Sequence, residues 1–328
     1  MDIRKIGNTA LAVTKLGFGG AAIGGLYREC TREAAMETLQ TAWDAGLRYF
    51  DTAPFYGFGL SERRLGDFLR SKPRETYVLS TKVGRLLRPV PEDQVPDYSY
   101  VSPLPFTVDY DYTYDGIMRS FEFSFARLGL NKIDILYVHD IGAYTHGAEK
   151  NAVYQRQLLD SGVRALEELK GSGTIGAYGL GVNEVEVCLE MIARSPIDCI
   201  LLAGRYSLLD RSAEGRLLDV CRANNISLVI GGVFNSGILA TGPVAGANFD
   251  YGPASDDVLS RVRAMQEIAE ANSIPLAAAA IQFPLREPVV ANVLIGTAKP
   301  SSLTRNLELM SVKVPDAAYA AFEPFTIR

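Results

Sequence analysis

The sequence has little of what membrane proteins, secreted proteins and nucleic-acid-binding proteins need. No window of roughly eighteen residues is apolar and free of charge, so no membrane-spanning helix is expected. The first five residues, Met-Asp-Ile-Arg-Lys, lack the apolar core of a secretion signal. The formal net charge of −5 supplies no basic field for polyanions. We therefore expect a cytoplasmic protein that binds neither nucleic acid nor a membrane.

Cysteine and histidine are also scarce. The four cysteines, Cys30, Cys188, Cys199 and Cys221, show no CxxC pattern and no pairing with histidine at metal-site spacing. Reduced thiols and no bound metal are therefore expected. The chain has no low-complexity tract and no linker rich in Pro, Gly or Ser, so residues 1–328 are expected to form one domain. We expect a monomer or a small homo-oligomer.

What the sequence does have is an alternation of short apolar strands and amphipathic helices. Its 328 residues, 48% of them hydrophobic, can bury a large core. Eight such strands separated by helical segments favour a single α/β barrel of the (β/α)8 type. A doubly wound dinucleotide-binding sheet is disfavoured, because residues 17–20, Gly-Phe-Gly-Gly, do not form a GxGxxG turn leading into a helix. A hairpin over 3–14 is expected to cover the closed end of the barrel.

The hydrophobic periods place the individual elements. Strands are expected at 15–18, 47–50, 77–82, 133–138, 177–182, 199–203, 227–230 and 293–295. Helices are expected at 31–45, 61–69, 116–128, 153–169, 185–193, 213–223, 256–271 and 277–283, with a last helix from residue 301. Thr31 and Ser61 are the expected N-caps of the first two helices. Long loops without regular structure are expected after strands three, four and seven, at 85–115, 140–151 and 231–253.

Four ionisable side chains are predicted to meet at the carboxyl ends of neighbouring strands. Asp51 ends the second strand, Lys82 the third and His139 the fourth, and Tyr56 lies on the loop after the second strand. In a barrel of parallel strands, the loops that leave these ends carry the active site. Any one of these residues alone would more often be a solvated or core residue; their joint placement is what indicates a function.

The same set fits proton transfer coupled to hydride transfer. A phenol titrates at about pH 10, so Tyr56 needs a nearby cation to act as a base, and Lys82 is expected to lower its pKa. Asp51 would hold the lysine, and His139, as a neutral donor, would orient the substrate oxygen. None of the four residues carries hydride, so a bound cofactor is required.

The motifs around these residues resemble those of the aldo-keto reductase family. The segments that carry the resemblance are 51–57 with 61–66, then 80–82, then 134–139. They occur in the family's order, and the resemblance extends from about residue 4 to residue 309. It implies a (β/α)8 barrel with the activity of an NAD(P)-dependent oxidoreductase.

The resemblance also implies a role for each residue of the set. Tyr56 is the acid/base, Asp51 and Lys82 are the pair that tunes it, and His139 orients the substrate. A small-molecule substrate and a nicotinamide cofactor are the implied ligands. An alternative of another class is a regulatory subunit that senses a nucleotide on the same barrel, because a fold alone does not fix a function.

Further residues resemble the family's cofactor contacts, from the nicotinamide end to the adenosine end. They are Gly19, Gly20, Ala21, Asn183, Phe234, Asn235, Ser236, Gly237, Leu239, Gly296, Thr297, Lys299 and Asn306. Asn183 corresponds to the carboxamide-binding position, which is commonly Ser. The loop 234–239 corresponds to the one whose backbone N–H groups hold the pyrophosphate.

Two departures from the family's pattern bear on the cofactor. Gly residues at 231–232 stand where the family usually has an aromatic residue that stacks on the nicotinamide. At the adenosine end, Gly296, Ala298 and Ser302 occupy places where NADP-preferring members often have Arg or Lys. A 2′-phosphate is best bound by Arg. NAD is therefore expected over NADP, with Lys299 as the residue that could compensate.

Three segments narrow the implied substrate. Residues 109–120, 203–209 and 232–242 resemble the aldose 1-dehydrogenase branch of the family. This branch implies oxidation of the anomeric hydroxyl group of an aldose, of the L-fucose or D-threo-aldose type, to a lactone. Pyridoxal 4-dehydrogenase is similar to the branch and gives the alternative, oxidation of pyridoxal to 4-pyridoxolactone. The tyrosine-rich loop 85–115 is expected to sit over the mouth as a lid packed by its own aromatic side chains.

Overall fold

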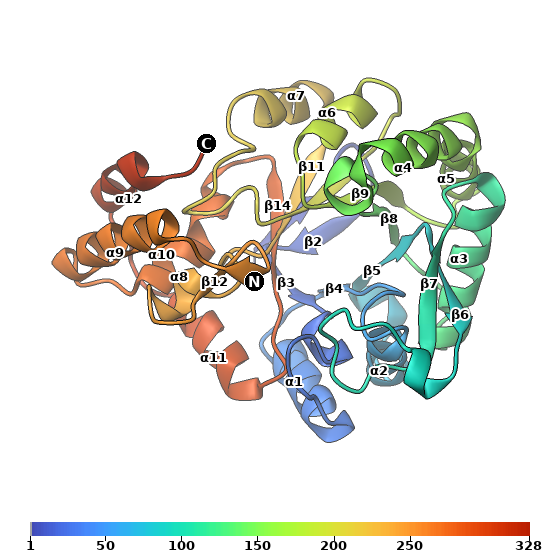
Figure 1. Ribbon diagram of the computed structural model, residues 1–328, viewed down its shortest axis with the longest axis horizontal. Coiled ribbons are helices and arrows are strands. Elements are labelled where there is room, and N and C mark those ends of the chain that lie inside the picture. The colour runs from blue at the N-terminus through green and yellow to red at the C-terminus, as the bar shows by residue number, and fades with distance from the viewer. Residues whose placement is uncertain (1) are drawn as a thin grey trace.

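The computed structural model describes residues 2–328. Eight parallel strands close into a barrel, and helices surround it (Figure 1). The barrel strands are β3 (Leu16–Gly19), β4 (Tyr49–Asp51), β5 (Val78–Val83), β8 (Ile135–His139), β9 (Ala177–Val182), β10 (Cys199–Ala203), β11 (Ser227–Gly231) and β14 (Val290–Ile295). Neighbouring strands follow the chain order, and β14 pairs with β3 to close the ring. The expected (β/α)8 barrel is confirmed.

Helices follow the barrel strands along the chain and cover the outside of the barrel. They are α1 (Arg32–Asp44), α2 (Leu60–Leu69), α3 (Tyr114–Leu128), α4 (Ala143–Gln157), α5 (Val163–Gly171), α6 (Glu186–Ile192), α7 (Arg216–Asn224), α8 (Ile238–Thr241), α9 (Asp256–Ala271), α10 (Leu276–Gln282), α11 (Pro300–Leu309) and α12 (Asp316–Phe322). Within residues 2–328, no helix is long and apolar enough to cross a membrane.

Strand alternation in β4 divides its side chains between the barrel interior and the helix layer. Phe50 points outward and stacks on Trp43 of α1, with ring centroids 6.3 Å apart. Tyr49 points inward, where its hydroxyl lies 2.9 Å from that of Tyr137. Two residues along the strand, Asp51 therefore also points into the barrel, at the carboxyl end.

The same period positions the side chains of β5 and β8. Thr81 points outward and donates to the Glu62 carboxylate of α2 over 2.8 Å, so Lys82 points inward. Tyr137 points inward on β8, and His139, two residues on, does the same at the end of that strand. Three strand-end side chains thus share one mouth because each strand keeps strict alternation.

An antiparallel hairpin closes the amino-terminal end of the barrel, as expected. It consists of β1 (Ile3–Lys5) and β2 (Ala12–Thr14). The N–H of Gly7 donates to the Ser227 hydroxyl at the start of β11 over 2.8 Å. Ile6 and Val13 pack into the interior cluster of the barrel, so the opposite end is left as the open mouth.

The expectation of an irregular loop over 85–115 is wrong. The segment contains an antiparallel hairpin of β6 (Arg85–Pro89) and β7 (Phe106–Tyr110). Its prolines hid the pattern, but they lie between the two strands or, like Pro89, at a strand end, where a missing N–H is tolerated. The helix that follows starts at Tyr114, with Thr113 as its N-cap.

Other boundaries also differ from those expected. The second loop, at 140–151, is mostly the helix α4, which is kinked at Gly147 and runs through the π-helical Leu158–Gly162 into α5. The third loop, at 231–253, contains α8 and a small hairpin of β12 (Asn248–Phe249) and β13 (Gly252–Pro253). The helix α12 had not been expected.

The two predicted N-caps have different outcomes. Thr31 caps α1 and accepts from the N–H of Ala34 over 3.2 Å, as expected. Ser61 does not cap α2, which begins one residue earlier. Its hydroxyl instead donates to the Gly20 carbonyl over 2.8 Å and lies 2.8 Å from the Thr52 hydroxyl. Ser61 therefore ties the first two loops of the mouth together.

Candidate active site

A buried ion pair forms the floor of the mouth. The Lys82 ammonium donates to Oδ2 of Asp51 over 2.6 Å and to the Thr52 carbonyl over 2.9 Å. The Ser80 hydroxyl donates to the other carboxylate oxygen of Asp51 over 2.7 Å. The two charged side chains are only 2% and 3% exposed. Because each is held by more than one hydrogen bond, their relative geometry is fixed.

Tyr56 lies above this pair. The Lys82 ammonium is 4.7 Å from the centroid of the Tyr56 ring. Among the described residues, no hydrogen bond uses the Tyr56 hydroxyl, although the ring lines both pockets of the mouth. That hydroxyl is therefore free to form a hydrogen bond with a substrate.

The expectation that Lys82 lowers the pKa of Tyr56 is wrong in this structure. Burial, followed by the negative charge of Asp51, raises the pKa of Tyr56 well above its ordinary value, and the cation that opposes the shift is Arg85. The reason is that Asp51 already neutralises the charge of Lys82. Tyr56 is thus a protonated phenol at neutral pH.

His139 completes the set at the end of β8. Its ring lies at 86° to that of Tyr56, with centroids 5.8 Å apart. Burial, and then the charges of Arg85 and Lys82, hold the pKa of His139 well below its usual range. The imidazole is therefore neutral at pH 7, as expected. The hydroxyl of Tyr112 donates to the His139 carbonyl over 2.8 Å and fixes the strand end.

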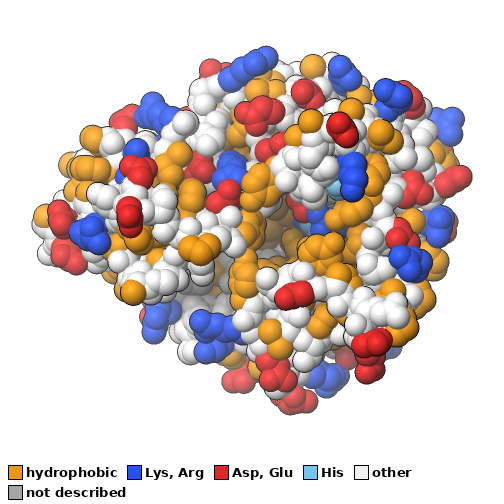
Figure 2. Space-filling view, viewed as in Figure 1, with side chains coloured by type: hydrophobic (Ala, Val, Ile, Leu, Met, Phe, Trp, Pro, Cys, Tyr) orange, Lys and Arg blue, Asp and Glu red, His pale blue; other side chains and the backbone are white. Residues whose placement is uncertain are grey.

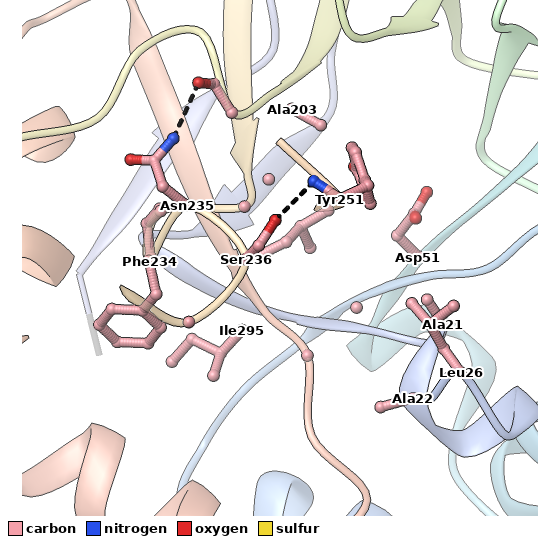
Figure 3. A pocket seen from close by; sticks show the side chains of 18 of the residues that line it. Ala21, Ala22, Leu26, Asp51, Ala203, Phe234, Asn235, Ser236, Tyr251 and Ile295 are labelled. Atoms are coloured by element: carbon pink, nitrogen blue, oxygen red, sulfur yellow. Dashed lines mark hydrogen bonds between the residues drawn. The ribbon is translucent and has the colours of Figure 1, made fainter. Parts of the chain in front are cut away.

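The structure places two adjoining pockets in the mouth, and Figure 2 shows the hollow with hydrophobic side chains around it. The first pocket has a volume of about 390 Å³ and is rich in glycine. Of the predicted cofactor residues, those that line it are Gly19, Gly20, Ala21, Phe234, Asn235, Ser236, Gly237 and Gly296 (Figure 3). The second pocket, of about 440 Å³, contains His139, Lys82 and Asn183. Tyr56 borders both.

The turn after β11 fits the binding of an anionic group such as a pyrophosphate. Asn235, Ser236 and Gly237 have φ of 44°, 57° and 101°, which turns the backbone sharply. In the described chain, the N–H groups of Val233, Phe234 and Ser236 donate to no acceptor. Successive free N–H groups in such a turn form an anion-binding concavity. The first pocket therefore suits a dinucleotide.

The side chain of Asn235 supports this turn rather than facing the pocket freely. Its amide group donates to the Gly204 carbonyl over 3.1 Å, and its oxygen accepts from the Ser207 hydroxyl over 2.5 Å. Asn235 is buried. The predicted contact of this residue with a cofactor can thus be made by its backbone.

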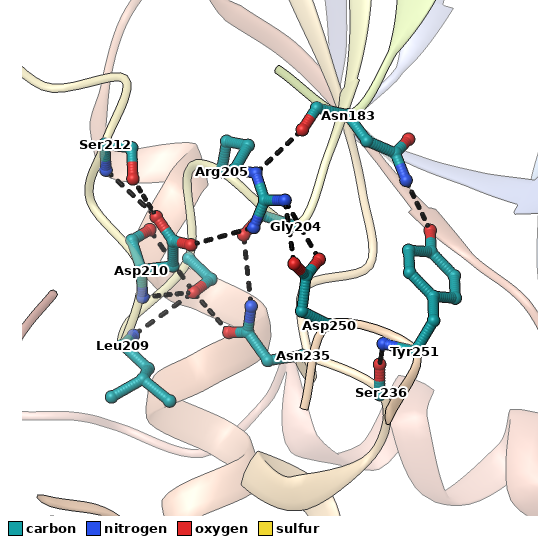
Figure 4. Close-up of polar contacts among 11 residues, drawn as sticks. Asn183, Gly204, Arg205, Leu209, Asp210, Ser212, Asn235, Ser236, Asp250 and Tyr251 are labelled. Atoms are coloured by element: carbon teal, nitrogen blue, oxygen red, sulfur yellow. Dashed lines mark hydrogen bonds and ion pairs between the residues drawn. The ribbon is translucent and has the colours of Figure 1, made fainter. Parts of the chain in front are cut away.

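Asn183 is engaged by residues that the sequence did not single out. Its amide donates to the Tyr251 hydroxyl over 3.0 Å, and its carbonyl accepts from Arg205 over 2.7 Å (Figure 4). The N–H of Tyr251 in turn donates to the Ser236 hydroxyl over 2.9 Å. Asp250, beside Tyr251, accepts two hydrogen bonds from Arg205. The turn 250–251 therefore spans the mouth between the two pockets.

Four predicted cofactor residues line neither pocket, and their roles stay predictions. Leu239 is buried in the core. Thr297 and Lys299 belong to the loop after β14, where the Thr297 hydroxyl accepts from the N–H of Lys299 over 3.1 Å. Asn306 lies on α11.

A second, partly buried ion pair was also missed. Arg85 donates to Oδ2 of Asp140 over 2.5 Å, and Asp140 lines the second pocket beside His139. The one sequence feature that could have pointed to Asp140 is its position directly after His139 at the end of a strand. Strand alternation, however, predicts that it points away from the mouth.

Comparisons with known proteins show what the whole chain is similar to. The profile of the aldo/keto reductase family matches residues 15–326. The chain is 44% identical to pyridoxal 4-dehydrogenase of Microbacterium luteolum, over 95% of this chain and 94% of that protein. It is 39% identical to D-threo-aldose 1-dehydrogenase of a Pseudomonas species, over 94% of this chain and 93% of that protein.

Solved structures show the same fold. An aldo-keto reductase of Bacillus halodurans in its holo form superposes with a TM-score of 0.78 at 23% identity, over 100% of this chain and 97% of that one. A glycerol dehydrogenase of Gluconobacter oxydans gives a TM-score of 0.77 at 22% identity, over 99% and 94% of the two chains.

Proposed function

Since this chain belongs to the aldo/keto reductase family, we propose that it oxidises the anomeric hydroxyl group of a cyclic aldose to a lactone, with NAD as the hydride acceptor. The observation that carries the proposal is the enclosed set of Asp51, Lys82, Tyr56 and His139 where the two pockets meet. The similarity to a protein named D-threo-aldose 1-dehydrogenase supports it. The two relatives at 44% and 39% identity are both named as dehydrogenases, which supports an enzyme rather than a nucleotide-sensing subunit.

Each residue of the set has a task in this reaction. The phenolate oxygen of Tyr56 takes up the proton of the anomeric hydroxyl group as the carbon–oxygen double bond of the lactone forms. His139, a neutral donor, orients the reacting oxygen. Asp51 and Lys82 fix the site and compensate each other's charge. A bound nicotinamide supplies the acceptor for the hydride that leaves the same carbon.

The first pocket supports NAD over NADP. None of the described residues that line it is Lys or Arg, so this lining offers no cationic side chain to bind a 2′-phosphate. Lys299 is exposed and lies outside the lining. The turn at Val233, Phe234 and Ser236 supplies neutral N–H donors, which suit the pyrophosphate common to both cofactors.

The second pocket favours a ring-shaped substrate. Besides Tyr56 and His139, five aromatic side chains line it: Tyr27, Phe55, Tyr98, Tyr100 and Tyr251. Aromatic faces bind the apolar face of a sugar ring and equally a flat aromatic ring. This lining, with the 44% identity to a protein named pyridoxal 4-dehydrogenase, favours pyridoxal as the second candidate substrate. Both substrates form cyclic hemiacetals that are oxidised to lactones.

A substrate panel tests the proposal. The purified protein is offered L-fucose, D-arabinose, L-galactose and pyridoxal, each with NAD and with NADP, and the absorbance of reduced nicotinamide is followed. We expect turnover of at least one sugar with NAD. Turnover of pyridoxal alone would select the second candidate. Cofactor binding without turnover of any of the four would overturn the proposed activity and favour the nucleotide sensor.

Other expectations stay predictions. They are a cytoplasmic location, one domain over 1–328, and a monomer or small homo-oligomer. Size-exclusion chromatography with light scattering measures the last of these directly.

A further inference from the structure

Asp140 follows the strand-end histidine, and its backbone turns it back toward the mouth. Its φ is +45°, in the left-handed region that L-residues other than Gly rarely adopt. A continued strand would point the side chain of residue 140 away from that of His139. Instead, Oδ2 of Asp140 lies 3.5 Å from Nε2 of His139. The disfavoured backbone thus places a second acidic group beside the reacting atoms.

A buried arginine holds one half of this carboxylate. Arg85 donates from Nη2 to Oδ2 of Asp140 over 2.5 Å. The guanidinium lies 4.2 Å from the ring centroid of Phe55 and 5.4 Å from that of Tyr110, and its side chain is only 3% exposed. Arg85 therefore has a fixed position and keeps the carboxylate of Asp140 in one orientation.

The other half of the carboxylate is available to a ligand. Among the described residues, no hydrogen bond uses Oδ1 of Asp140. The side chain is 21% exposed and lines the second pocket, together with His139. A carboxylate oxygen in a partly desolvated pocket is a strong acceptor for a hydroxyl group. A purely structural ion pair between the hairpin β6–β7 and β8 would not require such an accessible oxygen.

We propose that Asp140, oriented by Arg85, is a specificity-determining residue that accepts a hydrogen bond from the hydroxyl group on the carbon next to the one that is oxidised. This inference rests on the proposed function. The reacting oxygen meets Tyr56 and His139, and Asp140 is the charged group adjacent to His139 in the same pocket. The site therefore selects 2-hydroxy hemiacetals over their 2-deoxy analogues.

The test compares D-arabinose with 2-deoxy-D-erythro-pentose, which lacks only the 2-hydroxyl group. We expect the wild-type enzyme to prefer D-arabinose in kcat/KM, because loss of one hydrogen bond to a charged group costs about ten- to a hundredfold. In Asp140→Asn, the free half of the side chain becomes an NH2 donor. D-Arabinose should then lose about ten- to a hundredfold in kcat/KM, whereas the deoxy sugar changes less than about threefold.

Asp109→Asn is the matched control. Asp109 lies on the β6–β7 hairpin, which also carries Arg85, and it pairs with Arg88 over 2.8 Å. The side chains of Asp109 and Arg88 are both exposed and line neither pocket. This variant should leave the preference between the two sugars unchanged. Thermal unfolding of Asp140→Asn shows whether the hairpin stays folded.

The outcomes separate this inference from the proposed function. Equal losses for both sugars in Asp140→Asn would overturn the inference and leave the ion pair a structural or positioning role. If the enzyme turns over neither sugar, isothermal calorimetry measures the binding of D-arabinose to the complex of the enzyme with NADH. If the sugar binds and Asp140→Asn weakens that binding tenfold, only the proposed reaction fails. If the sugar binds no variant, or binds all equally, the inference fails too.

Discussion

Arg205 donates from Nη2 to both carboxylate oxygens of Asp250, over 2.9 and 3.0 Å. Its Nε donates to the Asn183 carbonyl over 2.7 Å and its Nη1 to Asp210 over 3.2 Å. One guanidinium thus joins the loops after β9 and β10 to the turn that carries Tyr251. Because Asp250 and Tyr251 line the first pocket, we expect the ion pair to slow the release of a ligand from it.

We predict that Asp250→Asn weakens NADH binding about three- to tenfold, mainly through faster dissociation. The loss of a partly exposed, bidentate ion pair costs roughly 1 kcal/mol, which corresponds to about fivefold. Stopped-flow fluorescence of NADH measures both rate constants. Asp219→Asn, which breaks the exposed pair with Arg222 on α7, is the control. An unchanged dissociation rate in Asp250→Asn would contradict the role of this turn as a cover.

Replacing the proposed acid/base should separate turnover from binding. In Tyr56→Phe the proton acceptor is gone, so kcat should fall about 10²- to 10⁴-fold. Cofactor affinity should stay within about twofold, because the hydroxyl makes no hydrogen bond in the described chain. Tyr114→Phe, which removes an exposed hydroxyl bonded to Glu168, serves as the control and should keep full activity. Turnover retained in Tyr56→Phe would assign the proton transfer to another group.

The raised pKa of Tyr56 gives the pH dependence of oxidation a definite sign. Oxidation requires the phenolate, and a pKa well above its ordinary value leaves little phenolate at neutral pH. As long as the pH is below the pKa, the phenolate fraction grows about tenfold with each unit by which the pH rises. Since kcat/KM reports the free enzyme, it should rise steeply between about pH 7 and pH 9. A flat profile over this range would show that the phenol of Tyr56 is not the titrating base.

The barrel and the convergence of the catalytic set follow from local sequence patterns. The strands β9 and β10 and the helix α9 have the boundaries that their hydrophobic periods predict. Strict alternation along β4, β5 and β8 is a property of each strand alone. It is therefore enough to direct Asp51, Lys82 and His139 into one mouth.

What the sequence did not reveal depends on contacts between distant residues. Arg205 and Asp250 are 45 residues apart, and neither motif alone indicates that they pair. The residue type of Asp140 does not reveal its left-handed backbone, because Asp tolerates that conformation better than most residues but adopts it at only a minority of positions. The pKa of Tyr56 depends on whether the charge of Lys82 is free or neutralised, which only the geometry decides.

The predicted adenosine end of the cofactor site offers a gain-of-function test of cofactor choice. Ser302 lies half-buried in the first turn of α11, near the place where a 2′-phosphate is expected. We predict that the wild type prefers NAD, and that Ser302→Arg raises the affinity for NADP about tenfold or more, because a guanidinium makes charge-assisted hydrogen bonds to phosphate. Affinity for NAD should change less than about twofold. Fluorescence titration with the reduced cofactors gives both constants.

The control for that variant is Thr304→Arg, which adds the same charge two residues along α11. Successive residues of a helix are rotated by about 100°, so position 304 faces nearly the opposite way, and its side chain is exposed. Thr304→Arg should leave NADP binding nearly unchanged. Equal gains in both variants would indicate a general effect of charge rather than a contact with the 2′-phosphate. A wild-type preference for NADP would instead assign that contact to Lys299, the cation already on the preceding loop.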